Sequence, residues 1–359
     1  MTSQSNSVAR MMPQGVRLWG TLSGRQALSA SISTPMNVLQ FAQRPCHQPR
    51  QYAVKGARMT TLPRQHDLVD EMDVAIALVH EVAAEVNRVY EAQTAANWAK
   101  GDGSPITDAD LRADRMIQER LVEAFPDDAR LTEESEDTPD RLENRRCWIA
   151  DPIDGTAQFV ARTGNFDVML ALVIDERPVL AVCGHPPSGT LVAAILDHGT
   201  WLIDPAGSAE RVTLAPPASP PIVSTSIYYA PDEYASELAT VADAVGAAPP
   251  EARTCGYGPR SLMPGWRDYD AFVGFWRKSG SSPVREWDLA PCDLITTEAG
   301  GAFTDLYGSV YRYNQPSPRP RAGLLVAADT DLHARLVEAL APLLPAHPAG
   351  SPQAGGDRA

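Results

Sequence analysis

The chain has 359 residues, of which 44% are hydrophobic and 21% are charged, and its formal net charge is −14. This composition is typical of a folded globular protein and excludes a chain that is disordered throughout. The acidic excess argues against a surface for nucleic-acid polymers or anionic membranes, because binding phosphate groups requires clustered Lys and Arg. No apolar run approaches the roughly 18 residues that span a bilayer. The composition therefore favours an enzyme that acts on small molecules.

The first 66 residues differ from the rest, since they contain no Asp or Glu and carry eight Arg or Lys residues. They also lack a sustained apolar period, so we expect residues 1–66 to form a disordered leader outside the fold. Three explanations stay open: an organelle transit peptide, a basic interaction tail, or translated sequence upstream of a start at Met59. The third is favoured, because a helical pattern begins soon after Met59.

The cysteines are odd in number and widely spaced, and the histidines show no spacing typical of metal ligands. This pattern predicts neither a disulfide framework nor a zinc site. A reducing, cytoplasmic compartment is the simplest expectation. The cysteines are Cys46, Cys147, Cys183, Cys255 and Cys292.

The first elements expected in the chain are two helices and a strand. Apolar residues at three- and four-residue steps predict a long amphipathic helix over residues 67–96. The pattern breaks at 101–105, and a second helix is expected from Thr107 to Pro126. The short apolar run 147–150 then predicts a buried strand.

Short apolar runs separated by turn residues predict an antiparallel meander further along the chain. The runs are 167–174, 179–183, 191–196 and 200–203. Residues 215–221 contain four prolines and predict a connection between two domains. Beyond it, alternating strands and helices predict a second, α/β layer. The strands are 222–226, 302–306 and 324–328, and the helices are 231–245, 287–299 and 330–344.

These elements predict two domains. We expect an N-terminal α+β domain over residues 67–214, built on the antiparallel sheet and carrying most of the metal ligands, and a C-terminal α/β domain over 222–344. Residues 345–359 are rich in Pro, Gly and Ala, so we expect them to form a disordered tail.

The segment 151–156 reads Asp-Pro-Ile-Asp-Gly-Thr and directly follows the expected buried strand. Two carboxylates at a strand end, with Pro restricting the backbone between them, can both face one cation. Gly155 permits a tight turn, and free amides at the start of a helix from Thr156 would suit a phosphate. An Asp-rich turn that caps a helix explains this segment alone equally well. A calcium loop does not fit, because it would need an oxygen ligand at Ile153.

Two further acidic segments accompany this motif. Glu133 and Glu134 lie upstream of the motif, and Asp288 lies downstream of it. Pro291 is tolerated only in the first turn of a helix, so this helix is expected to begin near Trp287 with Asp288 at its mouth. Taken singly, these acids are solvated surface charges or helix-stabilising residues. Taken together with the motif, their order points to one site.

This order of motifs resembles the inositol monophosphatase superfamily of Mg²⁺-dependent phosphomonoesterases, over about residues 67–344. The resemblance implies an α+β / α/β fold, a layered αβαβα sandwich, with the active site between its two parts. It also implies a small phosphorylated substrate, lithium sensitivity and a possible homodimer. The metal ligands that it implies are Glu133, Asp151, the carbonyl of Ile153, Asp154 and Asp288.

The resemblance further implies that Asp110, in the second helix, orients the attacking water together with Glu133 and Thr156. An acid in this position also stabilises a helix N-terminus, and both roles can coexist. Gly155, Thr156 and Asp288 are expected at the substrate, with the amides of the first two at the phosphate.

Oxygen ligands without His or Cys favour Mg²⁺, with Mn²⁺ as a possible substitute, over zinc. Two or three ions are implied. Two ions about 3.5–4 Å apart would activate water and stabilise the leaving alkoxide, without a covalent intermediate. Glu133 and Asp151 would hold the first ion, and Asp151, Asp154 and Asp288 the second.

Other segments are similar to the 3′(2′),5′-bisphosphate nucleotidase branch of the superfamily. This similarity is carried by Phe159, Gly164-x-Phe166 and Tyr313-Asn314-Gln315-Pro316, whereas Ala157, Gln158 and Asn165 depart from it. Candidates for contact with a second phosphate are Arg260, Arg267, Arg277 and Lys278. Inositol 1-phosphate and histidinol phosphate are the alternative substrates. A metal-binding scaffold without turnover is a weaker hypothesis of another class.

Overall fold

The computed structural model describes residues 68–101, 103–229, 231–253, 256–264, 268–276, 284–320 and 322–346. All of them belong to one compact unit of the chain, Pro45–Ala359. The expected leader over 1–66, and the expected tail from residue 347 onward, lie outside the described residues. Within the described part, no helix combines the length and the apolar character needed to cross a membrane.

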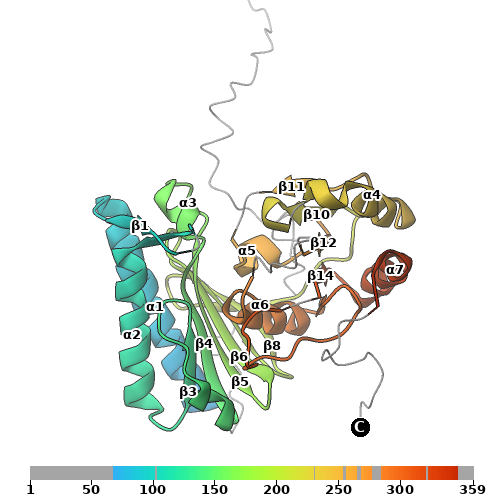
Figure 1. Ribbon diagram of the computed structural model, residues 1–359. Helices are drawn as coiled ribbons and strands as arrows, with labels where there is room; N and C mark the ends of the chain where they lie inside the picture. The colour runs from blue at the N-terminus through green and yellow to red at the C-terminus, as the bar shows by residue number, and fades with distance from the viewer. Residues whose placement is uncertain are drawn as a thin grey trace, which may run out of the picture. The chain divides into compact units, whose positions relative to one another are not determined.

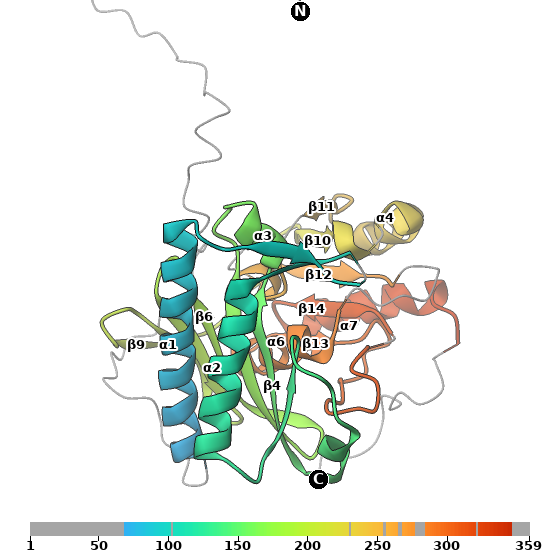
Figure 2. The ribbon, with the colours of Figure 1, turned by 60° about the vertical axis from the view of Figure 1, so that its left-hand side comes forward.

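Helices and sheets alternate in five layers (Figures 1 and 2). Two long helices cover one face of a seven-stranded sheet, and a buried helix separates this sheet from a five-stranded sheet. Two further helices pack on the outer face of the five-stranded sheet. The layered αβαβα sandwich expected from the sequence is therefore confirmed.

The first layer consists of α1 (Val69–Ala92) and α2 (Asp108–Ala124). Buried residues of α1 recur at three- and four-residue steps and pack on the sheet, as the periodicity predicts. The helix ends at Ala92 and not at residue 96, because Gln93 adopts a left-handed φ of 54°. An unexpected hairpin follows, in which β1 (Asn97–Ala99) pairs with β2 (Pro105–Thr107) and leads directly into α2.

The seven-stranded sheet has the order β3-β4-β5-β6-β7-β8-β9. Its strands are β3 (Ala129–Thr132), β4 (Arg146–Asp154), β5 (Asp167–Ile174), β6 (Arg177–His185), β7 (Thr190–Ile195), β8 (Gly199–Ile203) and β9 (Ala209–Val212). The expected meander is present as β5 to β8. The sheet is not purely antiparallel as expected, because β3 pairs parallel to β4. This pairing places Glu133, just after β3, beside the end of β4.

The strand β4 is longer than the predicted strand 147–150 and includes both Asp151 and Asp154. In a regular strand, residues three apart point to opposite faces. Here Asp151 pairs with Met169 and Asp154 pairs with Asp167, so β4 contains one more residue than β5 between the two pairs. This bulge turns both carboxylates toward the same side.

The buried middle helix is α6 (Glu286–Glu298), which packs against both sheets. It begins at Glu286, one residue before the predicted start, and Asp288 lies in its first turn as expected. Pro291 lies in the second turn and not in the first. Because proline has no N–H, the carbonyl of Trp287 lacks its usual helical partner.

The five-stranded sheet has the order β11-β10-β12-β14-β13, with parallel pairing around β10 and antiparallel pairing around β14. Its strands are β10 (Val223–Ser226), β11 (Glu251–Arg253), β12 (Ala271–Gly274), β13 (Ala302–Thr304) and β14 (Leu324–Ala327). The outer helices α4 (Ala235–Ala244) and α7 (Thr330–Leu340) are shorter than predicted, because 3₁₀ turns form at Pro231–Tyr234 and Ala341–Leu343. The Pro-rich segment 215–221 joins β9 to β10; a division into domains there stays a prediction.

Candidate active site

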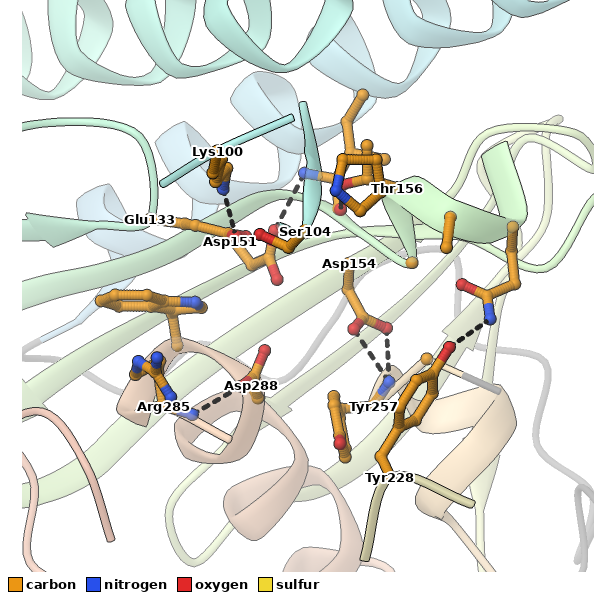
Figure 3. A pocket seen from close by; sticks show the side chains of 17 residues that line it. Lys100, Ser104, Glu133, Asp151, Asp154, Thr156, Tyr228, Tyr257, Arg285 and Asp288 are labelled. Carbon is orange, nitrogen blue, oxygen red and sulfur yellow. Dashed lines mark hydrogen bonds and ion pairs between the residues drawn. The ribbon is translucent and has the colours of Figure 1, made fainter. Parts of the chain in front are cut away.

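A cavity of about 430 Å³ lies where the end of β4 meets the first turn of α6 (Figure 3). The β1–β2 hairpin contributes Lys100 and Ser104 to its lining. Tyr228, from the 3₁₀ turn Ile227–Tyr229, and the loop 256–257 contribute from the second half of the chain. Both halves of the chain therefore supply residues to one cavity.

Three buried aspartates meet on the wall of this cavity. Asp151 and Asp154 come from β4 and Asp288 comes from α6, and each is at most 7% exposed. Each offers a carboxylate oxygen, and the three oxygens lie within 4.8 Å of one another. The structure therefore brings together three of the residues that the sequence predicts as metal ligands.

Backbone amides from the loop 256–258 hold Asp154 in place. Its Oδ2 accepts hydrogen bonds from the amides of Tyr257, at 2.7 Å, and Gly258, at 2.6 Å. A Cβ atom on Gly256 would lie 2.4 Å from this same oxygen, so only glycine permits the approach. Residues 256 and 257 are not among the predicted site residues, although Gly-Tyr-Gly is a signal for a close backbone approach.

The other two aspartates also accept hydrogen bonds from nearby amides. Oδ1 of Asp151 accepts from the amide of Ile153 at 3.0 Å. Oδ2 of Asp288 accepts from the amide of Arg285, the N-cap of α6, at 2.6 Å. The carboxylates are thus oriented by the backbone that carries them. Ile153, whose carbonyl is expected to be a further ligand, also lines the cavity.

Burial raises the pKa of all three aspartates. The pKa values of Asp151 and Asp288 lie well above the ordinary value, because burial is reinforced by the neighbouring acids. The pKa of Asp154 rises to about 6, since burial outweighs the hydrogen bonds from the amides. Buried carboxylates without a compensating cation are unfavourable. The donor set consists of oxygen atoms without His or Cys, so it fits a hard divalent cation such as Mg²⁺.

Glu133 lies at the edge of this group, beside Asp151. Its Oε1 lies 2.6 Å from Nζ of Lys100, which also lies 2.6 Å from Oε1 of Glu134. Although burial lowers the pKa of Lys100, the two carboxylates raise it above the ordinary value. Burial raises the pKa of Glu134 to about 7. The role of Glu133 as a metal ligand stays a prediction.

Thr156 and Asp110 form a hydrogen-bonded pair beside the aspartates. Thr156 begins the short helix α3 (Thr156–Val160), and its Oγ1 lies 2.9 Å from Oδ1 of Asp110 and 3.2 Å from the carbonyl oxygen of Ile153. Asp110 also forms a capping box with Thr107 at the start of α2. Burial raises the pKa of Asp110, and the hydrogen bonds from Thr107 and Thr156 oppose this effect. Asp110 thus caps α2 and also contacts Thr156, while its role in orienting the attacking water stays a prediction.

Gly155 forms the turn between β4 and α3. Its φ is 90°, and a Cβ atom there would lie 2.8 Å from the carbonyl oxygen of Asn165. Both features require glycine. Gly155 and Thr156 line the cavity, and their contact with a phosphate stays a prediction. Since α3 has only five residues, its dipole adds little to the site.

The aromatic residues that resemble the nucleotidase branch belong to the core. Phe159 and Phe166 are buried, with ring centroids 5.1 Å apart. Tyr313 is also buried, and its hydroxyl donates to Asp293. The basic residues expected at a second phosphate are not tested, because the side chain of Arg260 and residues Arg267, Arg277 and Lys278 lie outside the described part.

Residues for which the sequence predicted no role in the site line the cavity instead. Nε2 of Gln158 donates to the hydroxyl of Tyr228 at 3.2 Å, and the rings of Tyr228 and Tyr257 lie 6.3 Å apart. Arg285 and Lys100 are the cationic side chains in the described lining.

The sequence matches the inositol monophosphatase family over residues 67–345. A 3′(2′),5′-bisphosphate nucleotidase CysQ from Haemophilus influenzae is 26% identical over 249 residues, which cover 68% of this chain and 87% of that protein. A glucose-1-phosphate thymidylyltransferase from Streptomyces griseus is 33% identical over 214 residues, or 58% of this chain and 76% of that protein. The structure of an IMPase from Thermotoga maritima matches with a TM-score of 0.58 and 23% identity, over 76% of this chain and 98% of that one.

The match to the family covers most of the chain, and the fold agrees with it. The buried acidic cluster supplies the oxygen ligands that a metal-dependent phosphatase needs. This chain belongs to the inositol monophosphatase family and is a metal-dependent phosphomonoesterase.

Proposed function

We propose that the chain hydrolyses small phosphate monoesters with Mg²⁺-activated water, and that its preferred substrate is a 3′(2′),5′-bisphosphate nucleotide. The observation that carries the proposal is the convergence of Asp151, Asp154 and Asp288 on one cavity wall. Glu133, beside Asp151, and the carbonyl of Ile153 complete the proposed ligand set for two or three ions. When bound, Mg²⁺ supplies positive charge to the phosphate oxygens and lowers the pKa of a water molecule.

The pair Thr156 and Asp110 would orient the attacking water. The Thr156 hydroxyl has one hydrogen, which it donates to Asp110 or to the carbonyl of Ile153. Its oxygen lone pairs are then directed to accept a hydrogen bond from water. Glu133 is proposed to accept a second hydrogen bond from the same water. The alignment of attacking oxygen and phosphorus would thus depend on side chains from three elements.

The phosphate group of the substrate would meet donors on two sides. The amides of Gly155 and Thr156 lie at the start of α3, where a helix has no acceptors for them. Lys100 and Arg285 bring two cations to a cavity whose other charged side chains, among the described residues, are acidic. These cations and the bound metal would compensate the charge of the phosphate.

The organic part of the substrate would contact the aromatic side of the cavity. Tyr228, Tyr257 and Trp287 line it together with Gln158, and its volume of about 430 Å³ exceeds what a phosphate group alone needs. Aromatic side chains stack on nucleobases, whereas inositol has no aromatic face. This lining supports a nucleotide substrate, in agreement with the similarity of the sequence to bisphosphate nucleotidases.

Phosphate release tests the proposal. Adenosine 3′,5′-bisphosphate, inositol 1-phosphate, histidinol phosphate and fructose 1,6-bisphosphate would each be incubated with the full chain and Mg²⁺. We expect the highest kcat/KM for the bisphosphate nucleotide. A higher value for inositol 1-phosphate or histidinol phosphate would contradict the nucleotide assignment alone. Release from none of the four would contradict the hydrolytic proposal and favour a metal-binding scaffold.

A pair of variants separates recognition of the base from chemistry. Tyr228→Leu removes an aromatic face of the cavity and is expected to raise KM for the nucleotide more than KM for inositol 1-phosphate. Thr240→Val is the control, because its hydroxyl bonds within the exposed surface of α4 and lies outside the cavity. An equal change in KM for both substrates in Tyr228→Leu would argue against base stacking.

A further inference from the structure

We propose that Arg141, Asn314 and Glu286 form a positioning element that fixes Asp288 in the metal site and thereby sets the affinity of that site for its divalent cation. The inference rests on the proposed function, in which Asp288 is a metal ligand. The three residues are absent from the cavity lining among the described residues. Their effect would therefore reach the site through α6.

The element starts at the first residue of α6. Glu286 is 2% exposed, and its carboxylate accepts hydrogen bonds from the amides of Asn314, at 2.6 Å, and Gln315, at 3.0 Å. The amide of Glu286 donates to the carbonyl of Pro318 at 3.1 Å. The segment 314–318 thus holds the first turn of α6, the turn that carries Asp288.

Asn314 connects this turn to the other half of the chain. Its Oδ1 accepts a hydrogen bond from Nη1 of Arg141 at 2.7 Å, and its Nδ2 donates to the carbonyl of Arg141 at 3.1 Å. Nη2 of Arg141 donates to the carbonyl of Gln315 at 2.8 Å. The φ of Asn314 is 59°, a region that Asn tolerates better than most residues. These contacts give a role to the Tyr-Asn-Gln-Pro segment, which does not touch the cavity.

Arg141 anchors the element near the strands that carry the other acids. It lies in the 3₁₀ turn η2 (Pro139–Glu143), between β3 and β4 in the chain. Its side chain is 2% exposed and forms a two-pronged pair with Asp137, with Nε–Oδ1 at 2.6 Å and Nη2–Oδ2 at 3.1 Å. The strand β4 then carries Asp151 and Asp154. The element therefore connects the segment before β4, which carries Asp151 and Asp154, to α6, which carries Asp288.

The charges at the site explain why such an element is needed. Asp151, Asp154 and Asp288 repel one another before a cation binds, so the surrounding framework must fix their separation. Oδ2 of Asp288 accepts a hydrogen bond from the amide of Arg285, the N-cap of its own helix, so this oxygen moves with the first turn of α6. Loss of a partner that orients a ligand typically lowers metal affinity by about 10–100-fold.

Two variants test the element at different points. Asn314→Gly removes the two side-chain hydrogen bonds to Arg141 without changing charge, and it keeps the backbone amide, the left-handed φ and the bond from Arg141 to the carbonyl of Gln315. Glu286→Gln keeps the shape of the side chain but weakens its hydrogen bonds with the amides of Asn314 and Gln315. The control is Asp305→Asn, because Asp305 is also buried and also accepts from two backbone amides, those of Tyr307 at 2.8 Å and Ser309 at 2.9 Å. It lies after β13, outside the cavity lining.

The readouts are Mn²⁺ binding to the full chain by electron paramagnetic resonance, the Mg²⁺ concentration for half-maximal activity, and Tm without metal. In Asn314→Gly and Glu286→Gln we expect the Kd for Mn²⁺ and the half-activating Mg²⁺ concentration to rise by about tenfold or more. Activity at saturating Mg²⁺ should be retained, and Asp305→Asn should lower Tm without changing the Kd.

An unchanged Kd in both variants would overturn the proposal, as would an equal rise in Asp305→Asn, which would indicate general loosening of the fold. Absence of Mn²⁺ binding to the unmodified chain would also overturn it. Mn²⁺ binding without any phosphate release would instead contradict the proposed function, and the Kd values of the variants would still decide this inference.

Discussion

The hydroxyl of Thr156 lies 2.9 Å from Oδ1 of Asp110, and this hydrogen bond joins the turn after β4 to the first turn of α2. Asp110 simultaneously accepts a hydrogen bond from the amide of Thr107 at 2.8 Å and so caps its own helix. The hydrogen bond to Thr107 orients the carboxylate of Asp110, and this carboxylate orients the hydroxyl of Thr156. A helix N-terminus therefore orients a group that belongs to the candidate active site.

Thr156→Val tests this relationship, because valine keeps the shape of threonine and removes its hydroxyl. We expect kcat to fall by about 10²–10⁴-fold, since the proposed orientation of water is lost. The half-activating Mg²⁺ concentration should stay the same, because Thr156 is not among the proposed ligands. Thr200→Val is the control: its buried hydroxyl donates to the carbonyl of Ile295 at 2.6 Å, away from the cavity. An unchanged kcat in Thr156→Val would contradict the proposed role.

Asp154→Asn should abolish turnover and leave the fold intact. It should also stabilise the metal-free protein at pH 7. The pKa of Asp154 is about 6 in the folded chain against an ordinary 3.8, so ionisation at pH 7 opposes folding, and asparagine removes this cost. We expect a gain of about 1–2 kcal/mol in the free energy of unfolding, because part of the effect is lost with the hydrogen bonds from two amides.

Denaturant unfolding in the presence of a chelator measures this gain, and the same experiment with Mg²⁺ measures the metal contribution. The unmodified chain should be stabilised by Mg²⁺, and Asp154→Asn should lose most of that stabilisation. Near-normal phosphate release by Asp154→Asn would rule out its place in the metal site.

Gly256→Ala should damage the site without touching its acids. The added Cβ would lie 2.4 Å from Oδ2 of Asp154, so the loop or the carboxylate must move. A displacement of about 1 Å in a catalytic site can lower activity by about 10²-fold, and we expect a loss of this order in kcat/KM. Gly101→Ala is the matched control, because a Cβ there has no atom of the described residues within 4 Å. Equal activity of the two variants would contradict the close approach.

The candidate metal ligands could be predicted because their chemistry is local in the sequence. Asp151 and Asp154 lie within one short motif, and Asp288 is marked by a helix start and a nearby proline. The reason that the first two share a face could not be predicted, since it depends on a bulge in the pairing of β4 with β5. Alternation along an isolated strand would have placed them on opposite faces.

Contacts between distant segments were the part that the sequence did not reveal. The amide of Tyr257 donates to Asp154 across 103 positions. The glycines on either side of Tyr257 indicate a close backbone approach, but no residue pattern indicates which segment they approach. The position of Lys100 at the site could not be predicted, because the strands of its hairpin have three residues each and are too short to show a periodicity. Phe159 and Phe166 match the nucleotidase pattern in sequence. The structure places both residues in the core, where they are buried.

Asp293, on the buried face of α6, should make the protein less stable as the pH rises. Its Oδ2 accepts a hydrogen bond from Tyr313 at 3.0 Å, and its Oδ1 has no partner within the described part of the chain. Burial raises its pKa to about 6 from 3.8, so between these values the folded chain binds more protons than the unfolded chain. The free energy of unfolding therefore decreases from about pH 4 to about pH 6 and stays lower above that range.

Asp293→Asn removes this titration while keeping an acceptor for Tyr313. At pH 7 the variant should be more stable than the unmodified chain by up to about 3 kcal/mol, and the difference should vanish near pH 4. Urea unfolding of both proteins at the two pH values, with a chelator present, isolates the contribution of Asp293 from that of the metal-site acids. A stability difference that is the same at pH 4 and pH 7 would show that packing and not ionisation determines the effect of this residue.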